Sequence, residues 1–260
     1  MLTVRIFRTL SLLIVLALPF ACDDDSDGPV VKNCRIKEMY YDDVSNYTFQ
    51  FHYNSDGTLN SITSPNLLSR YKYENGKLKT IVRNIVGNVE TLTYNYPTDK
   101  LITWTSSSMD NRIYKLYYTG DKADSMIVND AQTGQPSLDF YSYPKYVANN
   151  VKTVNSSGGC CVYYIGDVEY DNGLNPASLL RKSVGAFTGQ DMMVYEFFSF
   201  RPDQLSENNP TRYKMSGSYN ALVEFEYTYA TQGSYPLTIS QYYDGDLNGF
   251  TTNFVYENCD

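Results

Sequence analysis

The chain has 260 residues, a net charge of −8 at pH 7, and 26 tyrosines and 12 phenylalanines but only one tryptophan, Trp104. An acidic surface repels phosphate, which argues against nucleic acid as a partner and against tight binding to anionic lipid headgroups. The abundant Tyr, Phe, Thr and Val are strand-forming residues and indicate an all-β fold.

The first 21 residues are predicted to be a secretory signal peptide. Arg5 and Arg8 form a short basic start, and the apolar stretch 10–18 that follows is too short to span a bilayer as a mature helix. Cleavage after residue 21 removes two arginines and no acid. A mature chain of 239 residues would therefore carry 19 basic and 29 acidic residues, a net charge of −10.

Cys22 follows Ala21 in a pattern that resembles the cleavage site of bacterial lipoproteins. In such proteins the cysteine sulfur receives a diacylglycerol and its freed amine a further acyl chain. Each buried methylene contributes about 0.8 kcal/mol, so several chains hold a protein firmly in a leaflet. The alternative is an ordinary secreted protein in which Cys22 is a chance cysteine.

Residues 22–33 are predicted to be an acidic tether, because Asp23, Asp24 and Asp25 come directly after the cysteine. The run resembles the export signal of Bacteroidetes-type surface lipoproteins. This resemblance implies a lipid-anchored protein on the outer face of the outer membrane. The alternative is a solvated linker, the usual role of a charge run.

The remaining residues, 34–260, are predicted to form one domain of repeated β-hairpins. In each repeat an aromatic strand that alternates at period two leads through a polar turn to a second strand, a pattern that favours strands over helices. Asp56-Gly57 and Asn75-Gly76 supply the positive φ angles of tight hairpin turns. The last tyrosine before each turn recurs after 20, 23 and 22 residues, at Tyr53, Tyr73, Tyr96 and Tyr118.

The repeats over about 51–128 resemble the YD repeats of Rhs-type proteins, with a looser match at 168–176 and 225–239. The whole chain resembles a family of gut-bacterial surface lipoproteins of unknown function built on such hairpins. The resemblance implies a hairpin-repeat fold and no established catalytic residues.

Two segments interrupt the strand pattern and are expected to be short helices or turns. Segment 143–150 has Pro144 early, and segment 175–182 has Asn175 as an N-cap and Pro176 at the first helical position. The expected fold is an all-β antiparallel meander of hairpins with one or two short helices. It forms a strongly curved sheet that closes as a barrel or stays open and twisted.

Four cysteines lie beyond Cys22, and an exported location favours disulfides among them. We expect Cys34 to pair with Cys259, which would stabilise the domain by roughly 5 kcal/mol in the chain-entropy model. Cys160 and Cys161 would then form a vicinal bond or remain thiols. A closed Cys34–Cys259 bond would bring the first and last strands together.

Two further motifs suggest sites, each with a plain alternative. Asp244, Asp246 and Asn248 are spaced like the first half of a calcium loop, although Val255 stands where the closing glutamate should be; the alternative is a hairpin turn. Ser125 lies in a short Asp-Ser-Met sequence that resembles the O-glycosylation acceptor of Bacteroidetes-type exported proteins. The alternative is a chance tripeptide.

The sequence gives no sign of an enzyme. It has no G-x-S-x-G, H-E-x-x-H or P-loop motif, and its one histidine, His52, lies inside an alternating strand. Apart from calcium, no cofactor is expected. We expect a non-catalytic surface module that binds a glycan or a protein, with Trp104 as the candidate stacking residue. The alternative is a structural envelope lipoprotein without a small ligand, since aromatic pairs stabilise sheets by themselves.

Overall fold

The computed structural model describes residues 34–42, 48–108, 112–120, 122–158, 162–184, 201–231, 234–247 and 251–259. The strands are β1 (Arg35–Tyr41), β2 (Thr48–Tyr53), β3 (Leu59–Ser64), β4 (Leu67–Glu74), β5 (Lys77–Ile85), β6 (Asn88–Thr98), β7 (Leu101–Ser106), β8 (Arg112–Thr119), β9 (Lys122–Asp130), β10 (Pro136–Val147), β11 (Asn150–Gly158), β12 (Val162–Leu174), β13 (Asn208–Gly217), β14 (Ala221–Tyr229), β15 (Pro236–Tyr243), β16 (Asp246–Leu247) and β17 (Thr252–Glu257). The helices are α1 (Pro176–Val184) and α2 (Pro202–Leu205).

The strands form a closed antiparallel barrel, which confirms the predicted fold class. Successive strands pair along the chain, β15 pairs with both β16 and β17, and β1 pairs with β17 to complete the ring. The pairing of β1 with β17 brings Cys34 and Cys259 together, and the two form the predicted disulfide with a Cα–Cα distance of 4.1 Å. Closure leaves no long sheet edge open to pairing with another chain.

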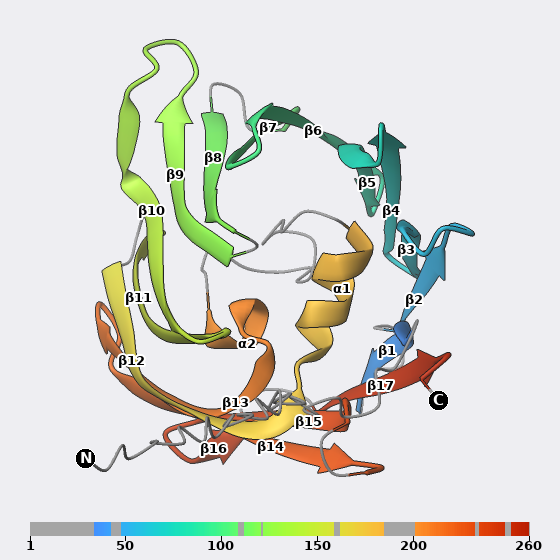
Figure 1. Cartoon of the computed structure of the whole chain (residues 1–260), viewed down its shortest axis with the longest axis vertical. Helices are drawn as coiled ribbons and strands as arrows, with labels where there is room; N and C mark the ends of the chain where they lie inside the picture. The colour runs from blue at the N-terminus through green and yellow to red at the C-terminus, as the bar shows by residue number, and fades with distance from the viewer. Residues whose placement is uncertain are drawn as a thin grey trace, which may run out of the picture. The chain divides into compact units, whose positions relative to one another are not determined.

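Both helices lie inside the barrel (Figure 1), where apolar side chains make up most of the buried surface and several polar side chains are buried with them. Alternate strand residues are buried, and α1 buries Ala177, Leu179 and Leu180 within the ring. The largest fully buried side chains include three tyrosines and eight aliphatic residues: Tyr94, Tyr114, Tyr213, Ile36, Leu59, Leu78, Ile81, Leu92, Leu116, Ile165 and Val128. Among the described residues, these side chains and the two helices make up much of the barrel core.

The outer face of the barrel is largely polar. Between the buried positions of the strands stand exposed charged and amide side chains, among them Gln50, His52, Asn60, Arg70, Lys72, Asn95, Lys145, Lys152, Lys214 and Glu226. Exposed apolar side chains also occur on several of the described strands and turns, among them Val89, Val162, Leu237 and Val255.

The recurring tyrosines found in the sequence have a common structural role. The hydroxyls of Tyr53, Tyr73 and Tyr96 donate to backbone carbonyls of an earlier strand or its flank, at 2.7, 2.9 and 2.9 Å. The same kind of bond continues around the barrel from Tyr170, Tyr227 and Tyr256. We call these six residues the inner tyrosine ring. Three of its members, Tyr53, Tyr73 and Tyr170, directly follow a β-bulge, where the ladder is interrupted.

The predicted helix at 175–182 is present as α1. Asn175 caps it through its Oδ1 atom, which accepts a hydrogen bond from the Ala177 amide at 2.9 Å. Near the other end of α1, Arg181 donates from Nη2 to the Ser206 carbonyl at 3.1 Å and so ties α1 to the end of α2. Both helices are consequently fixed to each other inside the ring.

The helical turn expected at 143–150 is wrong. These residues form the end of β10, a tight turn and the start of β11, with Ala148 at a φ of 51°. Pro144 is buried and pairs in register with Val154, and a bulge follows between Lys145 and Tyr146. The residues on both sides of Pro144 pair with β11, so the proline that suggested a helix lies within a strand.

Candidate functional site

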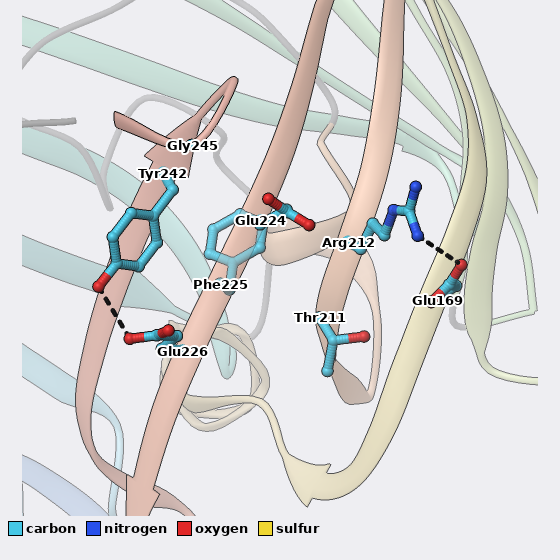
Figure 2. Close-up of a pocket in the computed structure, with 8 residues that line it drawn as sticks. All are labelled: Glu169, Thr211, Arg212, Glu224, Phe225, Glu226, Tyr242 and Gly245. Atoms are coloured by element: carbon cyan, nitrogen blue, oxygen red, sulfur yellow. Dashed lines mark hydrogen bonds and ion pairs between the residues drawn. The ribbon is translucent and has the colours of Figure 1, made fainter. Parts of the chain in front are cut away.

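A polar groove lies on the outer face of the barrel where β12, β13, β14 and β15 run side by side. Cross-strand pairing sets Glu169 opposite Arg212, Arg212 opposite Glu224, and Glu224 opposite Tyr242. Residues that lie directly opposite each other on paired strands point to the same face of the sheet, so these four side chains point outward together. The hollow has a volume of about 450 Å³ and is lined by these four side chains with Thr211, Phe225, Glu226 and Gly245 (Figure 2).

Two interactions hold side chains of this hollow in place. Arg212 Nη1 lies 3.7 Å from Glu169 Oε1, and the Tyr242 hydroxyl donates to Glu226 Oε2 at 2.8 Å (Figure 2). The hydrogen bond to the Glu226 carboxylate raises the pKa of Tyr242, because the carboxylate accepts the phenol proton in this bond. The row therefore offers carboxylate acceptors, a guanidinium donor and a phenol ring on one surface.

A second hollow adjoins the first on the same strands. It has a volume of about 460 Å³ and is lined by ten residues: Tyr164, Gly166, Asp167, Lys214, Met215, Ser216, Asn220, Ala221, Leu222 and Asp244. Lys214 Nζ lies 3.0 Å from Asp167 Oδ2. The side chain of Asp244 accepts a hydrogen bond from the Leu222 amide at 2.8 Å. We refer to the two hollows together as the outer groove.

Tyr164 is the exposed aromatic residue of the outer groove, with 48% of its surface accessible. Its ring leans over Gly166: a Cβ atom at that position would lie 2.7 Å from Tyr164 Cε1. A side chain at residue 166 would therefore push the ring away. Glycine permits the tyrosine to lie against the strand backbone and to present its other face to solvent.

Trp104, the residue expected to stack on a ligand, is a core residue instead. It is 2% exposed and lies between Tyr94 and Tyr114, with ring centroids 6.1 and 5.1 Å away. A solvent ligand cannot reach a ring so enclosed, so the prediction of Trp104 as a binding residue is wrong. Its position on an alternating strand did not reveal which face of the sheet is buried.

The candidate calcium residues lie in a hairpin turn. Asp244 and Gly245 have positive φ angles between β15 and β16, and Asp246 begins β16. Asn248 lies outside the described residues. Among the residues that are described, no cluster of three or more His, Cys, Asp or Glu side chains could hold a metal ion. The calcium motif stays a prediction.

Ser125 lies on β9 opposite Tyr117 and is partly exposed, so its glycosylation remains a prediction. His52 is exposed, and its Nε2 atom lies 3.2 Å from the Thr63 hydroxyl.

Several predicted sites fall outside the described part of the chain. The lipidated Cys22, the sorting residues Asp23, Asp24 and Asp25, and the pair Cys160 and Cys161 all belong to this group. No helix in the described ranges is both long enough and apolar enough to cross a membrane.

The outer groove itself was not anticipated from the sequence. Its residues come from four strands, of which β12 is separated along the chain from the consecutive strands β13, β14 and β15, and their side chains meet only through the register of these strands. The available local signals were Glu224 and Glu226 two residues apart on one face, and Tyr164 two residues before Gly166. Neither signal identifies a site without the pairing of the strands.

No protein-family model and no curated protein matches the chain. Among the solved structures that match the chain are two porin-like proteins. A porin-like protein from Bacteroides uniformis ATCC 8492 shares 14% identity over 85% of this chain and 96% of its own, with a TM-score of 0.50. A porin-like protein from Bacteroides vulgatus ATCC 8482 shares 10% identity over 85% and 98%, with a TM-score of 0.39. At these identities, the first likeness supports the barrel fold alone.

Proposed function

We propose that this protein is a non-catalytic, carbohydrate-binding lipoprotein of the bacterial cell envelope, and that the outer groove is its binding site. One observation carries the proposal: the rings of Tyr164 and Tyr242 share an outward surface with Arg212 and Glu224. Aromatic faces stack on the apolar faces of sugar rings, while carboxylates and guanidinium groups bond to sugar hydroxyls.

The barrel supports this role as a rigid scaffold and not as a pore. Membrane-spanning barrels carry an apolar band outside and a polar interior. Here α1 and α2 lie inside the ring, where many apolar side chains are buried together with polar ones such as Gln204 and Asn209, and the exposed strand residues are mostly polar. We therefore propose no pore activity for this chain, although the neighbouring proteins are described as porin-like. The closed barrel holds the groove side chains on adjacent, paired strands.

Location at the cell surface is part of the proposal and rests on the N-terminal sequence. Cys22→Ala should release the protein from the membrane fraction, because the lipid anchor is lost. Replacing Asp23, Asp24 and Asp25 with alanine should leave the protein in membranes but abolish labelling of intact cells. Retention of Cys22→Ala in membranes would contradict the anchor, and unchanged labelling would contradict the sorting signal.

Binding is tested by titrating the purified protein calorimetrically with plant, mucin and microbial oligosaccharides. For a sugar that binds, Tyr242→Ala should weaken the affinity by about 1–3 kcal/mol, on the scale of aromatic stacking measured for bases. Tyr117→Ala is the matched control, because Tyr117 is an outward, partly exposed tyrosine on β8, away from the groove. An equal loss in both variants would contradict the assignment of the groove.

The second candidate is a structural envelope lipoprotein with no small ligand. Its support is that the charged groups of the groove already pair with each other, Arg212 with Glu169 and Lys214 with Asp167. Such cross-strand pairs stabilise a solvated sheet face without a ligand. Absence of binding to every polysaccharide class in the titration would favour this second function.

A further inference from the structure

A row of exposed tyrosines continues the outer groove onto the neighbouring strands. Tyr143 on β10 pairs with Asn155 on β11, and Asn155 pairs with Tyr164 on β12. All three side chains are exposed, while their chain neighbours Ser142, Val154 and Ile165 are buried. The two rings therefore face solvent on the same side of the sheet, with one amide between them. We call these three residues the tyrosine row.

The spacing of the row is fixed by the sheet. Strands two apart in the hydrogen-bonding direction are separated by about 10 Å, so Tyr143 and Tyr164 stand that far apart at their backbones. This separation is close to the length of a disaccharide unit in an extended β-1,4-linked chain. A polymer crossing the strands would thus place every second sugar over a ring.

Both rings are supported from one side. Tyr141 lies beside Tyr143 with ring centroids 5.4 Å apart and planes inclined by 34°. Tyr164 leans on Gly166, as described above. These supports restrict how the two rings can turn, and 43% of Tyr143 and 48% of Tyr164 remain exposed. Two braced, exposed rings lose little freedom when a ligand stacks on them.

The row itself is uncharged, and the acids begin only in the outer groove, at Asp167 and Glu169. Asn155 supplies both a donor and an acceptor for sugar hydroxyls between the rings. The carboxylates that line the groove outnumber its two cations, Arg212 and Lys214, so an acidic polysaccharide would be repelled on balance. The chemistry of the surface therefore selects a neutral chain.

We propose that the tyrosine row binds a neutral, extended β-linked glucan that lies across β10, β11 and β12 and runs on into the outer groove. This inference rests on the proposed carbohydrate-binding function and names its ligand class. An extended ribbon can follow a row of rings across a gently twisted sheet. An α-linked chain of the same sugar coils and cannot contact both rings at this spacing.

The test titrates the purified protein calorimetrically with cello-oligosaccharides of two to six sugars, and with maltohexaose as the α-linked counterpart. Affinity should rise with length until the chain spans both rings, and cellohexaose should bind at least tenfold more tightly than maltohexaose. Tyr143→Ala and Tyr164→Ala should each weaken cellohexaose binding by roughly tenfold. Tyr117→Ala should leave the affinity unchanged, and thermal unfolding of each variant verifies that it is folded.

Equal affinity for the two hexaoses, or unchanged binding by Tyr143→Ala, would overturn the tyrosine row as a glucan site. If Tyr242→Ala alone lost binding, the proposed function would stand and this inference would fail. If no carbohydrate bound at all, both would fail. If Tyr143→Ala lost stability but not affinity, the row would be a packing feature of the sheet.

Discussion

Tyrosine serves two different purposes on the two faces of this barrel. In the inner tyrosine ring, hydroxyls donate to backbone carbonyls, as Tyr53 does to Ile36 and Tyr96 to Leu78. On the outer face, Tyr143 and Tyr164 are more than 40% exposed and their rings meet solvent. The difference shows that tyrosine content alone does not indicate binding. The direction of the side chain and the partner of its hydroxyl decide the role.

The inner ring has a physical reason to use tyrosine and not phenylalanine. A β-bulge or a strand end leaves a carbonyl without its ladder partner, and a buried unpaired acceptor costs about 1–3 kcal/mol. A tyrosine can fill space with its ring and satisfy that carbonyl with its hydroxyl. The outer tyrosines meet no such demand, which leaves their faces available.

Alkaline pH should have the largest effect on stability, because it acts on several members of the inner tyrosine ring at once. Burial raises the pKa of Tyr96 to about 12 and raises those of Tyr53, Tyr170 and Tyr256 as well. Since the folded-state pKa values lie above the ordinary value near 10, these residues stabilise the fold fully below about pH 10. That contribution is lost as the pH rises from 10 through about 12.

Circular dichroism and tyrosinate absorbance, followed together against pH, measure this effect. Ionisation of the inner tyrosines should coincide with loss of the fold, after the exposed tyrosines have ionised. A single tyrosine titration near pH 10 with the fold intact would contradict the burial of the inner ring.

Replacement of Trp104 should have the next largest effect on the free energy of unfolding. Trp104→Ala removes a large ring from between Tyr94 and Tyr114 and should destabilise the barrel by about 3–5 kcal/mol in urea unfolding. If that variant does not fold, Trp104→Phe should show a smaller loss. In any folded variant the affinity for cellohexaose should be unchanged. Weaker binding would contradict the conclusion that Trp104 does not contact the ligand.

Removal of single tyrosine hydroxyls should have the smallest effect on stability, and this effect should differ between the two faces of the barrel. Tyr96→Phe should cost about 1 kcal/mol, because the Leu78 carbonyl loses its donor. Tyr164→Phe should stay within about 0.5 kcal/mol of the original protein, as surface substitutions usually do. Equal losses in the two variants, measured by the same urea unfolding, would erase the distinction between the faces.

Much of the fold could be predicted because its signals are local. The spacing of Tyr53, Tyr73 and Tyr96 indicated repeated hairpins, and Asn175-Pro176 indicated the start of α1. The ends of the domain allowed the pairing of Cys34 with Cys259. These features depend on residues near in sequence or on a simple closure of the chain.

The site could not be predicted in the same way. Whether an aromatic residue on an alternating strand points inward depends on bulges that shift the register, so Trp104 could not be placed in the core from its own segment. The groove depends on the pairing of four strands, and Tyr143 lies in a segment whose Pro144 suggested a helix. Tertiary pairing, and not local preference, brings Tyr143, Asn155 and Tyr164 together.

Hydroxyl-radical footprinting of the purified protein, with and without cellohexaose, tests the division of the tyrosines most directly. Mass spectrometry should find Tyr143, Tyr164 and Tyr219 oxidised in the free protein, and Tyr94 and Tyr213 untouched, in accordance with their exposure. The sugar should protect Tyr143 and Tyr164 but not Tyr219, which lies in the turn between β13 and β14. Oxidation of Tyr94 and Tyr213, or identical patterns with and without bound sugar, would contradict the account.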